Sequence, residues 1–206
     1  MALNITLVIV VLTVLVSWRA FNDQRLLDCL ILWPPAVERN RQYERMLTHG
    51  FIHADWMHLL FNMITLWSFG GAVERVFVEW IGPAGYVGFY LSAIVIAMLP
   101  TYLRHRHDPR YRSLGASGGV SAVLFSFILF DPWSKLIIFP IPLPIPAIVF
   151  AVLYVVYSIW MDRQGTGKTN HSAHLWGAAY GILFTVLLEP AVLGHFTQTL
   201  LGSGSP

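Results

Sequence analysis

The sequence predicts an all-α integral membrane protein built as a bundle of six transmembrane helices. Hydrophobic residues make up 56% of its 206 residues and charged residues only 12%, against roughly 25% charged residues in a soluble domain. Six apolar stretches alternate with short connections that are charged or rich in proline and glycine. A soluble fold of this length cannot hide so much apolar surface, so lipid is the expected solvent for most of the chain.

The six stretches cover residues 3–18, 56–72, 83–103, 115–130, 143–161 and 172–188. About 20 apolar residues in a helix cross the hydrocarbon core of a bilayer. Backbone groups in lipid have to be hydrogen-bonded within their own segment, so each stretch is expected to be a helix. The connections are too short to fold separately, and we therefore expect one domain over residues 1–206. The first stretch lacks a basic flank and a small-residue cleavage site, so it is expected to be retained.

Two further segments are apolar but are not expected to span. Residues 29–37 are too short, and Pro34 and Pro35 interrupt them, so we expect them at the membrane interface. The prolines around the start of the fifth stretch predict a stiff loop leading into its helix: Pro140, Pro142, Pro144 and Pro146.

Charge and cysteine content exclude several classes of function. The net charge of +2 is too small for a nucleic-acid surface. Cys29 is the single cysteine, so neither an intramolecular disulfide nor a cysteine-rich metal site is expected. His49, His53 and His58 have no Cys or Glu at a suitable spacing to complete a set of metal ligands. We expect no metal and no cofactor.

The fourth stretch indicates a cavity. Ser117 to Phe130 spans only roughly 20 Å of a bilayer core that is roughly 30 Å thick. If Phe130 lies at one interface, Ser117 lies about 10 Å inside the other face. Irregular backbone before Ser117 is tolerated at that depth only where protein buries it or water reaches it. The sequence therefore predicts a water-filled cavity with a serine at its floor.

One polar pair lies on the second stretch. His58 and Asn62 are four residues apart and share one helix face. Polar side chains inside a membrane helix usually face the bundle interior or a cavity. Both can donate hydrogen bonds, which suits the stabilisation of a developing oxyanion. The alternative is that they only join helices by hydrogen bonds.

A serine stands between glycines at the start of the fourth stretch, in the run Gly115-Ala116-Ser117-Gly118. Glycines allow a close approach of backbone, and a helix N-terminus favours negative charge. These properties suit a nucleophile beside an oxyanion site. The alternative is a motif of small residues for helix packing, because Gly118 and Ala122 have that spacing.

A histidine stands beside a stripe of small residues on the sixth stretch. Ala173, Gly177 and Gly181 step by four along one face, which lets another helix pack closely. If that helix is the fourth, His174 reaches Ser117 and can take its proton as a general base. No carboxylate is placed to orient His174, so a dyad is favoured over a triad. The alternative is a buried histidine bonded to backbone.

These motifs together resemble the rhomboid family of intramembrane serine proteases over roughly residues 43–190. The family's three patterns, in their order along the chain, are His-x4-His-x3-Asn, Gly-x-Ser-Gly and Ala-His-x2-Gly-x3-Gly. They match His53, His58 and Asn62; Gly115, Ser117 and Gly118; and Ala173, His174, Gly177 and Gly181.

The resemblance implies a serine endopeptidase that cleaves transmembrane segments of single-pass membrane proteins. Ser117 would be the nucleophile and His174 the base. His58, Asn62 and the Ser117 N–H would form the oxyanion hole, and His53 would organise the first loop. The chain would be a multi-pass protein of a bacterial cytoplasmic membrane, with its oligomeric state open. The alternative is a non-catalytic relative that binds transmembrane helices.

The sequence also departs from the family pattern. Some members carry an aromatic residue four positions after the nucleophile, stacked on the catalytic histidine, and here that position is Ser121. A Trp-Arg pair usual in the first loop is replaced by Glu44-Arg45.

Two indications of sidedness disagree. The resemblance implies an active site toward the extracytoplasmic side. The positive-inside rule places the Ser117 face in the cytoplasm, because only Arg75 and Lys135 lie on the opposite face. The Ser117 face holds Arg19, Arg25, Arg39, Arg41, Arg45, Arg104, Arg106, Arg110, Arg112, Arg163 and Lys168.

Overall fold

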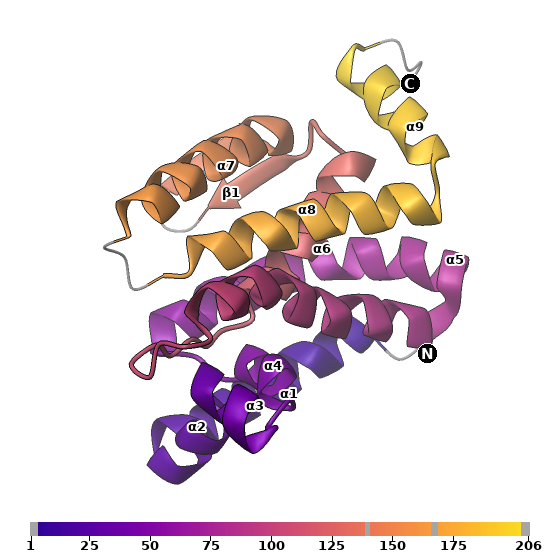
Figure 1. The fold of residues 1–206 in the computed structure, drawn as a ribbon. Coiled ribbons are helices and arrows are strands. Elements are labelled where there is room, and N and C mark those ends of the chain that lie inside the picture. Colours follow the sequence, from indigo (N-terminus) through magenta and orange to yellow (C-terminus); the bar gives the residue numbers. More distant parts are fainter. Residues whose placement is uncertain (1–3, 139–140, 166–168, 203–206) are drawn as a thin grey trace.

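The structure is a computed structural model that describes residues 4–138, 141–165 and 169–202. It is mainly helical, and the one sheet within these residues is a two-stranded hairpin. Figure 1 shows the long helices lying side by side, with the short helices between residues 24 and 48 grouped at one edge of the bundle. In chain order the elements are α1 (Ile5–Phe21), α2 (Gln24–Leu30), α3 (Pro34–Asn40), α4 (Arg45–Thr48), a 3-10 turn (His49–Phe51), α5 (Trp56–His105), α6 (Ser117–Phe130), β1 (Lys135–Ile138), β2 (Ile141–Pro146), α7 (Ala147–Gln164), α8 (His171–Leu188) and α9 (Ala191–Leu200).

The longest element, α5, consists of two helical arms joined at a sharp break. Gly82 leaves the helical conformation, with φ 72° and ψ 171°, which glycine adopts at little cost. The arms, residues 56–81 and 83–105, fold back on each other, and the Tyr86 hydroxyl donates a hydrogen bond to the Gly70 carbonyl at 3.3 Å. The second and third predicted stretches therefore lie in separate arms of one element.

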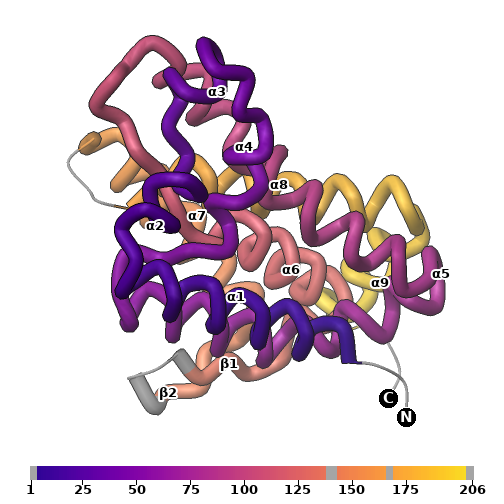
Figure 2. The backbone as a smooth tube through the Cα atoms, turned by 90° about the horizontal axis from the view of Figure 1, so that it is seen from below, coloured from indigo at the N-terminus to yellow at the C-terminus, as the bar shows by residue number. Residues whose placement is uncertain are grey.

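Helix α6 lies at the centre of the bundle. Figure 2 shows it enclosed by the surrounding helices. From Gly118 to Leu129 nearly every residue is buried, as expected for a helix that is apolar on all sides. Its 14 residues make it shorter than α7 and α8, which have 18 each.

Helices α6 and α8 pack backbone against backbone. A Cβ atom added to Gly177 would collide with the Gly118 carbonyl, and one added to Gly181 with the Ala122 carbonyl. Such close contact requires small residues on both helices. The glycines of α8 therefore lie in its contact with α6.

Length and composition identify candidate membrane spans within the described residues. Trp56–His105 and Ala147–Gln164 are each long and apolar enough to cross a membrane. Helices α8 and α9 meet the same test only as a pair, and a bend of 115° separates them. Helices α1 and α6 are apolar but shorter. Large apolar side chains lie exposed along α1 and α7, including Leu12, Leu15, Val152 and Val156, which suits contact with lipid.

The fifth predicted stretch, residues 143–161, differs from the structure at its start. Residues 143–146 belong to β2, and the helix begins only at Ala147. Strand β2 pairs antiparallel with β1, and Leu136 lies opposite Ile145. The stiff loop predicted from the proline run is therefore wrong for the described residues, where the chain forms a hairpin.

The prolines themselves explain the extended conformation. Pro142, Pro144 and Pro146 occupy alternate positions of β2. Proline has a fixed φ and no N–H, so it suits strand positions that do not donate to the neighbouring strand. Pro140, the first proline of the predicted loop, lies outside the described residues.

Residues 29–37 form the end of α2 and the start of α3. Pro34 stands in the first turn of α3, where its missing N–H costs no helical hydrogen bond. Pro34, Pro35, Ala36 and Val37 are buried, so this part of the segment packs onto the protein.

Candidate active site

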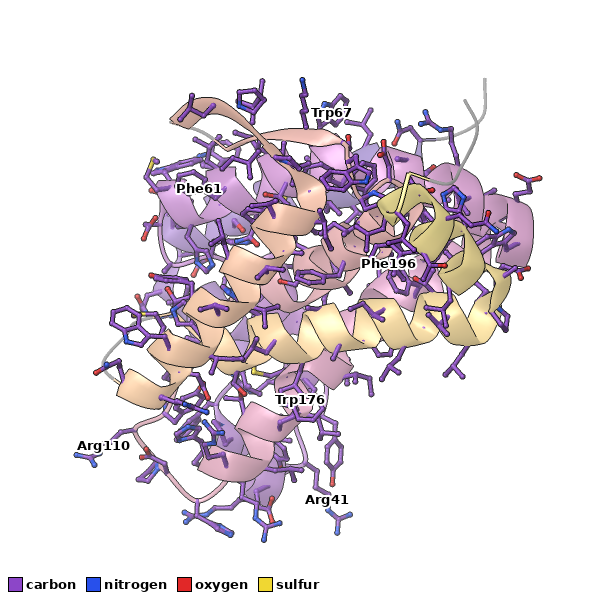
Figure 3. All side chains as sticks on the ribbon, turned by 90° about the horizontal axis from the view of Figure 1, so that it is seen from above. Arg41, Phe61, Trp67, Arg110, Trp176 and Phe196 are labelled. Atoms are coloured by element: carbon purple, nitrogen blue, oxygen red, sulfur yellow. The ribbon has the colours of Figure 1, made fainter. Side chains whose placement is uncertain are left out.

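Ser117 begins α6 where two cavities meet. An outer cavity of about 950 Å³ and an inner cavity of about 240 Å³ share Ser117, His58, Phe61 and Thr169 in their linings. Because Ser117 belongs to both linings, it lies at the junction of the two spaces. Phe61, which also belongs to both, projects from the first arm of α5 (Figure 3).

The outer cavity has several charged and polar side chains among its lining residues. Its lining includes Arg104, Arg112, Asp162, Asn170 and His171. Arg104 and Asp162 form an ion pair at 3.6 Å between the second arm of α5 and α7. Such a lining suits access of water to Ser117 from one end of the bundle.

The inner cavity continues from Ser117 between α5, α6, α7 and α8, with β1 at one side. Apolar side chains such as Phe69, Leu124 and Leu136 contribute to it. The polar side chains in its lining are His58, Asn62, Thr65, Ser68, Ser117, Ser121, Tyr154, Thr169 and His174. Polar groups from several helices thus converge on one small space beside Ser117.

The backbone before Ser117 is held by a chain of hydrogen bonds through His53. The Ala116 N–H donates to His53 Nε2 at 3.4 Å, so Nδ1 carries the ring proton and points to Ser17 Oγ at 2.9 Å. Ser17 Oγ in turn donates to the Phe51 carbonyl at 3.0 Å. Burial lowers the pKa of His53 to about 3, which keeps the ring neutral at physiological pH. His53 therefore ties α1 and the loop to the start of α6.

Gly115 adopts a conformation that a residue with a side chain rarely takes. Its φ is +119°, and an added Cβ would lie 2.6 Å from Cε1 of His58. Its N–H donates to the His49 carbonyl at 2.9 Å. Glycine at this position lets the chain turn into α6 while the His58 ring stays close.

His58 and Asn62 lie one turn apart on α5. The His58 N–H is capped by Asp55 Oδ1 at 2.8 Å, and Asn62 Nδ2 donates to the His58 carbonyl at 2.9 Å. The His58 and His53 rings meet edge to face at 5.0 Å. The side chains of His58 and Asn62 line the inner cavity together with Ser117, so the structure brings this predicted pair to the serine.

His174 projects from the first turns of α8 into the inner cavity. It lies beside the tight α6–α8 contact, where an added Cβ on Gly118 would be 3.6 Å from the Ala173 carbonyl. His174 Nε2 is buried and has no hydrogen-bond partner within the described residues. A buried ring nitrogen without a partner is unusual in a folded protein. The same part of the structure contains no hydrogen bond between His174 and Ser117 Oγ.

The start of α6 supplies the remaining polar groups of the site. Its N-cap residue, Ala116, has no side chain that can cap the helix. The first N–H groups of a helix lack partners within it and carry partial positive charge. The N-terminus of α6 is therefore suited to negative charge next to Ser117.

Comparison with known proteins decides the family. A family model described as the rhomboid domain matches residues 40–191, most of the chain. The chain belongs to the rhomboid family. This finding agrees with the resemblance predicted from the three motifs, all of which lie inside the matched range.

Curated relatives of this rhomboid come from plants, yeast and bacteria. "RHOMBOID-like protein 12, mitochondrial" of Arabidopsis thaliana is 29% identical over 81% of the chain and 52% of its own length. "Rhomboid protein 1, mitochondrial" of Saccharomyces cerevisiae is 29% identical over 75% and 44%. "Rhomboid protease GlpG" of an Enterobacter species is 29% identical over 82% and 56%. The chain spans about half the length of these relatives.

Two aromatic neighbours of His174 in this rhomboid were missed by sequence reasoning. The Tyr154 ring of α7 stacks on the His174 ring, with centroids 5.7 Å apart and planes at 18°. His171, one turn earlier on α8, meets His174 edge to face at 5.4 Å. Spacing on α8 could have indicated His171, but no local pattern on α7 singles out Tyr154.

Side chains that could bind a metal ion are not clustered in residues 4–138, 141–165 and 169–202 of this rhomboid. They contain no set of three or more His, Cys, Asp and Glu side chains arranged to hold an ion. The His53 and His58 rings are in contact, but both ring nitrogens of His53 lie in hydrogen bonds, to Ser17 Oγ and to the Ala116 N–H.

Proposed function

We propose that this chain is an intramembrane serine endopeptidase in which Ser117 is the nucleophile and His174 the general base. One observation carries the proposal. Ser117, at the N-terminus of the buried helix α6, lines the same small cavity as His174, whose Nε2 is buried and has no partner among the described residues. A nucleophilic serine needs a base within reach, and an unpartnered ring nitrogen is free to accept its proton.

The chemistry follows from these positions. Ser117 Oγ attacks the carbonyl carbon of the scissile peptide bond while His174 Nε2 takes the hydroxyl proton. The oxyanion is stabilised by the Ser117 N–H at the helix N-terminus and by His58 and Asn62, which line the same cavity. Collapse breaks the C–N bond, and His174 returns the proton to the leaving amine. Water from the outer cavity then hydrolyses the acyl-enzyme.

The substrates proposed are transmembrane segments of single-pass membrane proteins. The inner cavity combines apolar walls with a few polar groups, which suits a segment that leaves lipid as it reaches Ser117. The relative named a rhomboid protease supports proteolysis as the type of reaction. The lipid bilayer surrounds the enzyme. The proposed reaction uses no cofactor.

We further propose that the single domain over residues 1–206 crosses the bilayer six times. The passes are α1, the two arms of α5, α6, α7 and α8, which together account for every predicted stretch. The membrane proposed from the sequence is a bacterial cytoplasmic one, while the named relatives include mitochondrial and bacterial proteins. Cell fractionation and glycosylation mapping of the connections would test these two points.

The decisive test is cleavage of a labelled single-pass model substrate by purified protein in detergent. Ser117→Ala and His174→Ala are expected to abolish cleavage while the thermal unfolding temperature stays close to that of the wild type. Ser92→Ala and His107→Ala are matched controls, because neither residue lines the cavities. Cleavage at the wild-type rate by Ser117→Ala would overturn the mechanism.

A non-catalytic protein that binds transmembrane helices is the second candidate. The observation in its favour is that no hydrogen bond joins Ser117 to His174 within the described residues. Labelling with a fluorophosphonate separates the two candidates. An endopeptidase is expected to be labelled at Ser117 in the wild type and not in His174→Ala, whereas a helix-binding protein would not be labelled in either.

A further inference from the structure

Among the residues that the structure describes, no carboxylate is hydrogen-bonded to the proposed base, His174, to orient it. Within the described residues His174 Nε2 has no hydrogen-bond partner. The two acidic side chains that line the outer cavity are engaged elsewhere, Asp55 by the His58 N–H and Asp162 by Arg104. A base that can rotate freely is badly placed to take a proton from a serine. Something other than a third polar residue has to hold the ring.

Two aromatic contacts surround His174. The Tyr154 ring lies nearly parallel to it, with 5.7 Å between centroids and 18° between planes. The His171 ring meets it edge-on at 5.4 Å. Of the two, only Tyr154 covers a face of the imidazole, and only a face-on ring restricts tilting about the His174 side-chain bonds.

We infer that Tyr154 of α7 is a positioning residue that holds His174 in the orientation needed to act as the base. This inference rests on the proposed function. The stacked ring limits rotation of the imidazole, in the role that a carboxylate has in a triad. It also favours the protonated form during the reaction, because an aromatic face within about 6 Å attracts a cation.

Tyr154 can do this because its own ring is fixed. Its hydroxyl lies 2.6 Å from Ser121 Oγ, and its ring packs against Phe125 at 5.7 Å and Phe150 at 5.6 Å. Ser121 stands one turn after Ser117 on α6. Tyr154 therefore joins the helix of the nucleophile to the ring of the base.

The position of Tyr154 on α7 makes the orientation of the His174 ring depend on how that helix packs. Only Ala147, Ala151 and Ser158 of α7 are buried, so this helix is attached through a narrow face. Any displacement of α7 away from α6 and α8 removes the ring that holds His174. The orientation of the base thus depends on the seating of α7.

Substitutions of Tyr154 separate its ring from its hydroxyl. Tyr154→Phe keeps the stacked ring and loses the hydrogen bond to Ser121, and Ser121→Ala removes the same hydrogen bond from the other side. Tyr154→Leu keeps apolar volume and loses the aromatic face. We expect kcat to fall on the order of tenfold in Tyr154→Leu with little change in KM, and by less than about threefold in the other two variants.

The pH profile gives a second readout that a purely structural role would not move. Loss of the aromatic face disfavours protonated His174, so the acidic limb of kcat is expected to shift to lower pH in Tyr154→Leu and to stay in place in Tyr154→Phe. The rate of fluorophosphonate labelling at Ser117 is expected to fall in parallel with kcat, since it reports the same base without a protein substrate.

The inference is overturned if Tyr154→Leu matches the wild type in kcat and pH profile, or if Phe and Leu variants lose activity equally. Should Tyr154→Leu fail to fold, Tyr154→Met replaces it, because a flexible side chain fills the same space. Unfolding of both non-aromatic variants alongside a folded Phe variant would assign Tyr154 a structural role and also overturn it. Failure of the proposed function is distinct, because it is shown by cleavage in Ser117→Ala.

Discussion

The α6–α8 contact and the α7 contact hold the proposed site in different ways. Glycines on α8 lie directly against carbonyls of α6, so these two backbones have one possible separation. Helix α7 instead presents a narrow buried face, while Val152 and Val156 are exposed on its outer side. Backbone-to-backbone contact fixes where His174 lies, and a side chain from the more loosely held helix fixes how its ring is turned.

Gly177→Leu is expected to have the largest effect and tests the fixed half of this comparison. The new side chain would meet the Gly118 carbonyl and force α6 and α8 apart, so activity is expected to fall by more than about 100-fold and the unfolding temperature to drop. Gly71→Ala is the matched control, because no atom lies within 4 Å of the added Cβ. Wild-type cleavage by Gly177→Leu would show that the two helices need no close contact.

His53 tests how strongly the loop is fixed to α6. Its pKa is lowered to about 3 by burial, so between pH 6.5 and 3 the unfolded chain binds a proton that the folded chain does not. Stability is therefore expected to fall as pH decreases through this range, by about 1.4 kcal/mol per pH unit from His53. Burial also lowers the pKa of His49 to about 4, so His49 makes stability depend more steeply on pH between about pH 4 and 6.5.

His53→Gln isolates this contribution. The variant is expected to lose about 1–3 kcal/mol at pH 7, because buried groups bonded to His53 lose a partner. Its stability should also depend less steeply on pH than that of the wild type, because about one proton fewer is taken up on unfolding. Thermal unfolding in detergent between pH 7 and pH 4 measures both quantities, and equal slopes for the two proteins would contradict the role of His53.

Ala151→Leu tests the loosely held half of the comparison. Ala151 is buried where α7 packs on Leu124 and Phe125, so a larger side chain is expected to push α7 outward and lower kcat by about tenfold. In a Tyr154→Leu background the same change should cost little more, because the ring is already absent. Val152→Leu, on the exposed face, is the control. Additive losses would show that α7 acts on the site by another route.

Arg104→Gln is expected to have the smallest effect. The Arg104 and Asp162 side chains are 58% and 28% exposed, and an exposed ion pair contributes about 0–1 kcal/mol. Cleavage and unfolding temperature are expected to stay near wild type, with little response to added salt. A large loss of activity would mean that this ion pair, and not the narrow buried face of α7, holds the helix in place.

Several elements could be predicted from the sequence because their signals are local. The run from Gly118 to Leu129 is apolar on all sides, and the structure buries it as α6. The hairpin before α7 was missed because alternating prolines have no helical or strand periodicity that distinguishes a loop from an edge strand. A connection was expected between the stretches 56–72 and 83–103, and the break at Gly82 lies there. The first arm was expected to end at residue 72, but it continues to residue 81.

The sequence by itself determined the membrane character, the rhomboid family and the residues proposed for the dyad. Composition, small-residue spacing and short motifs are properties of neighbouring residues, and each can be seen without knowing the fold. Only the tertiary structure decided that Tyr154 stacks on His174 and that His53 joins Ser17 to Ala116. These contacts join residues from separate helices, and no local pattern in the chain specifies which side chains meet when those helices pack.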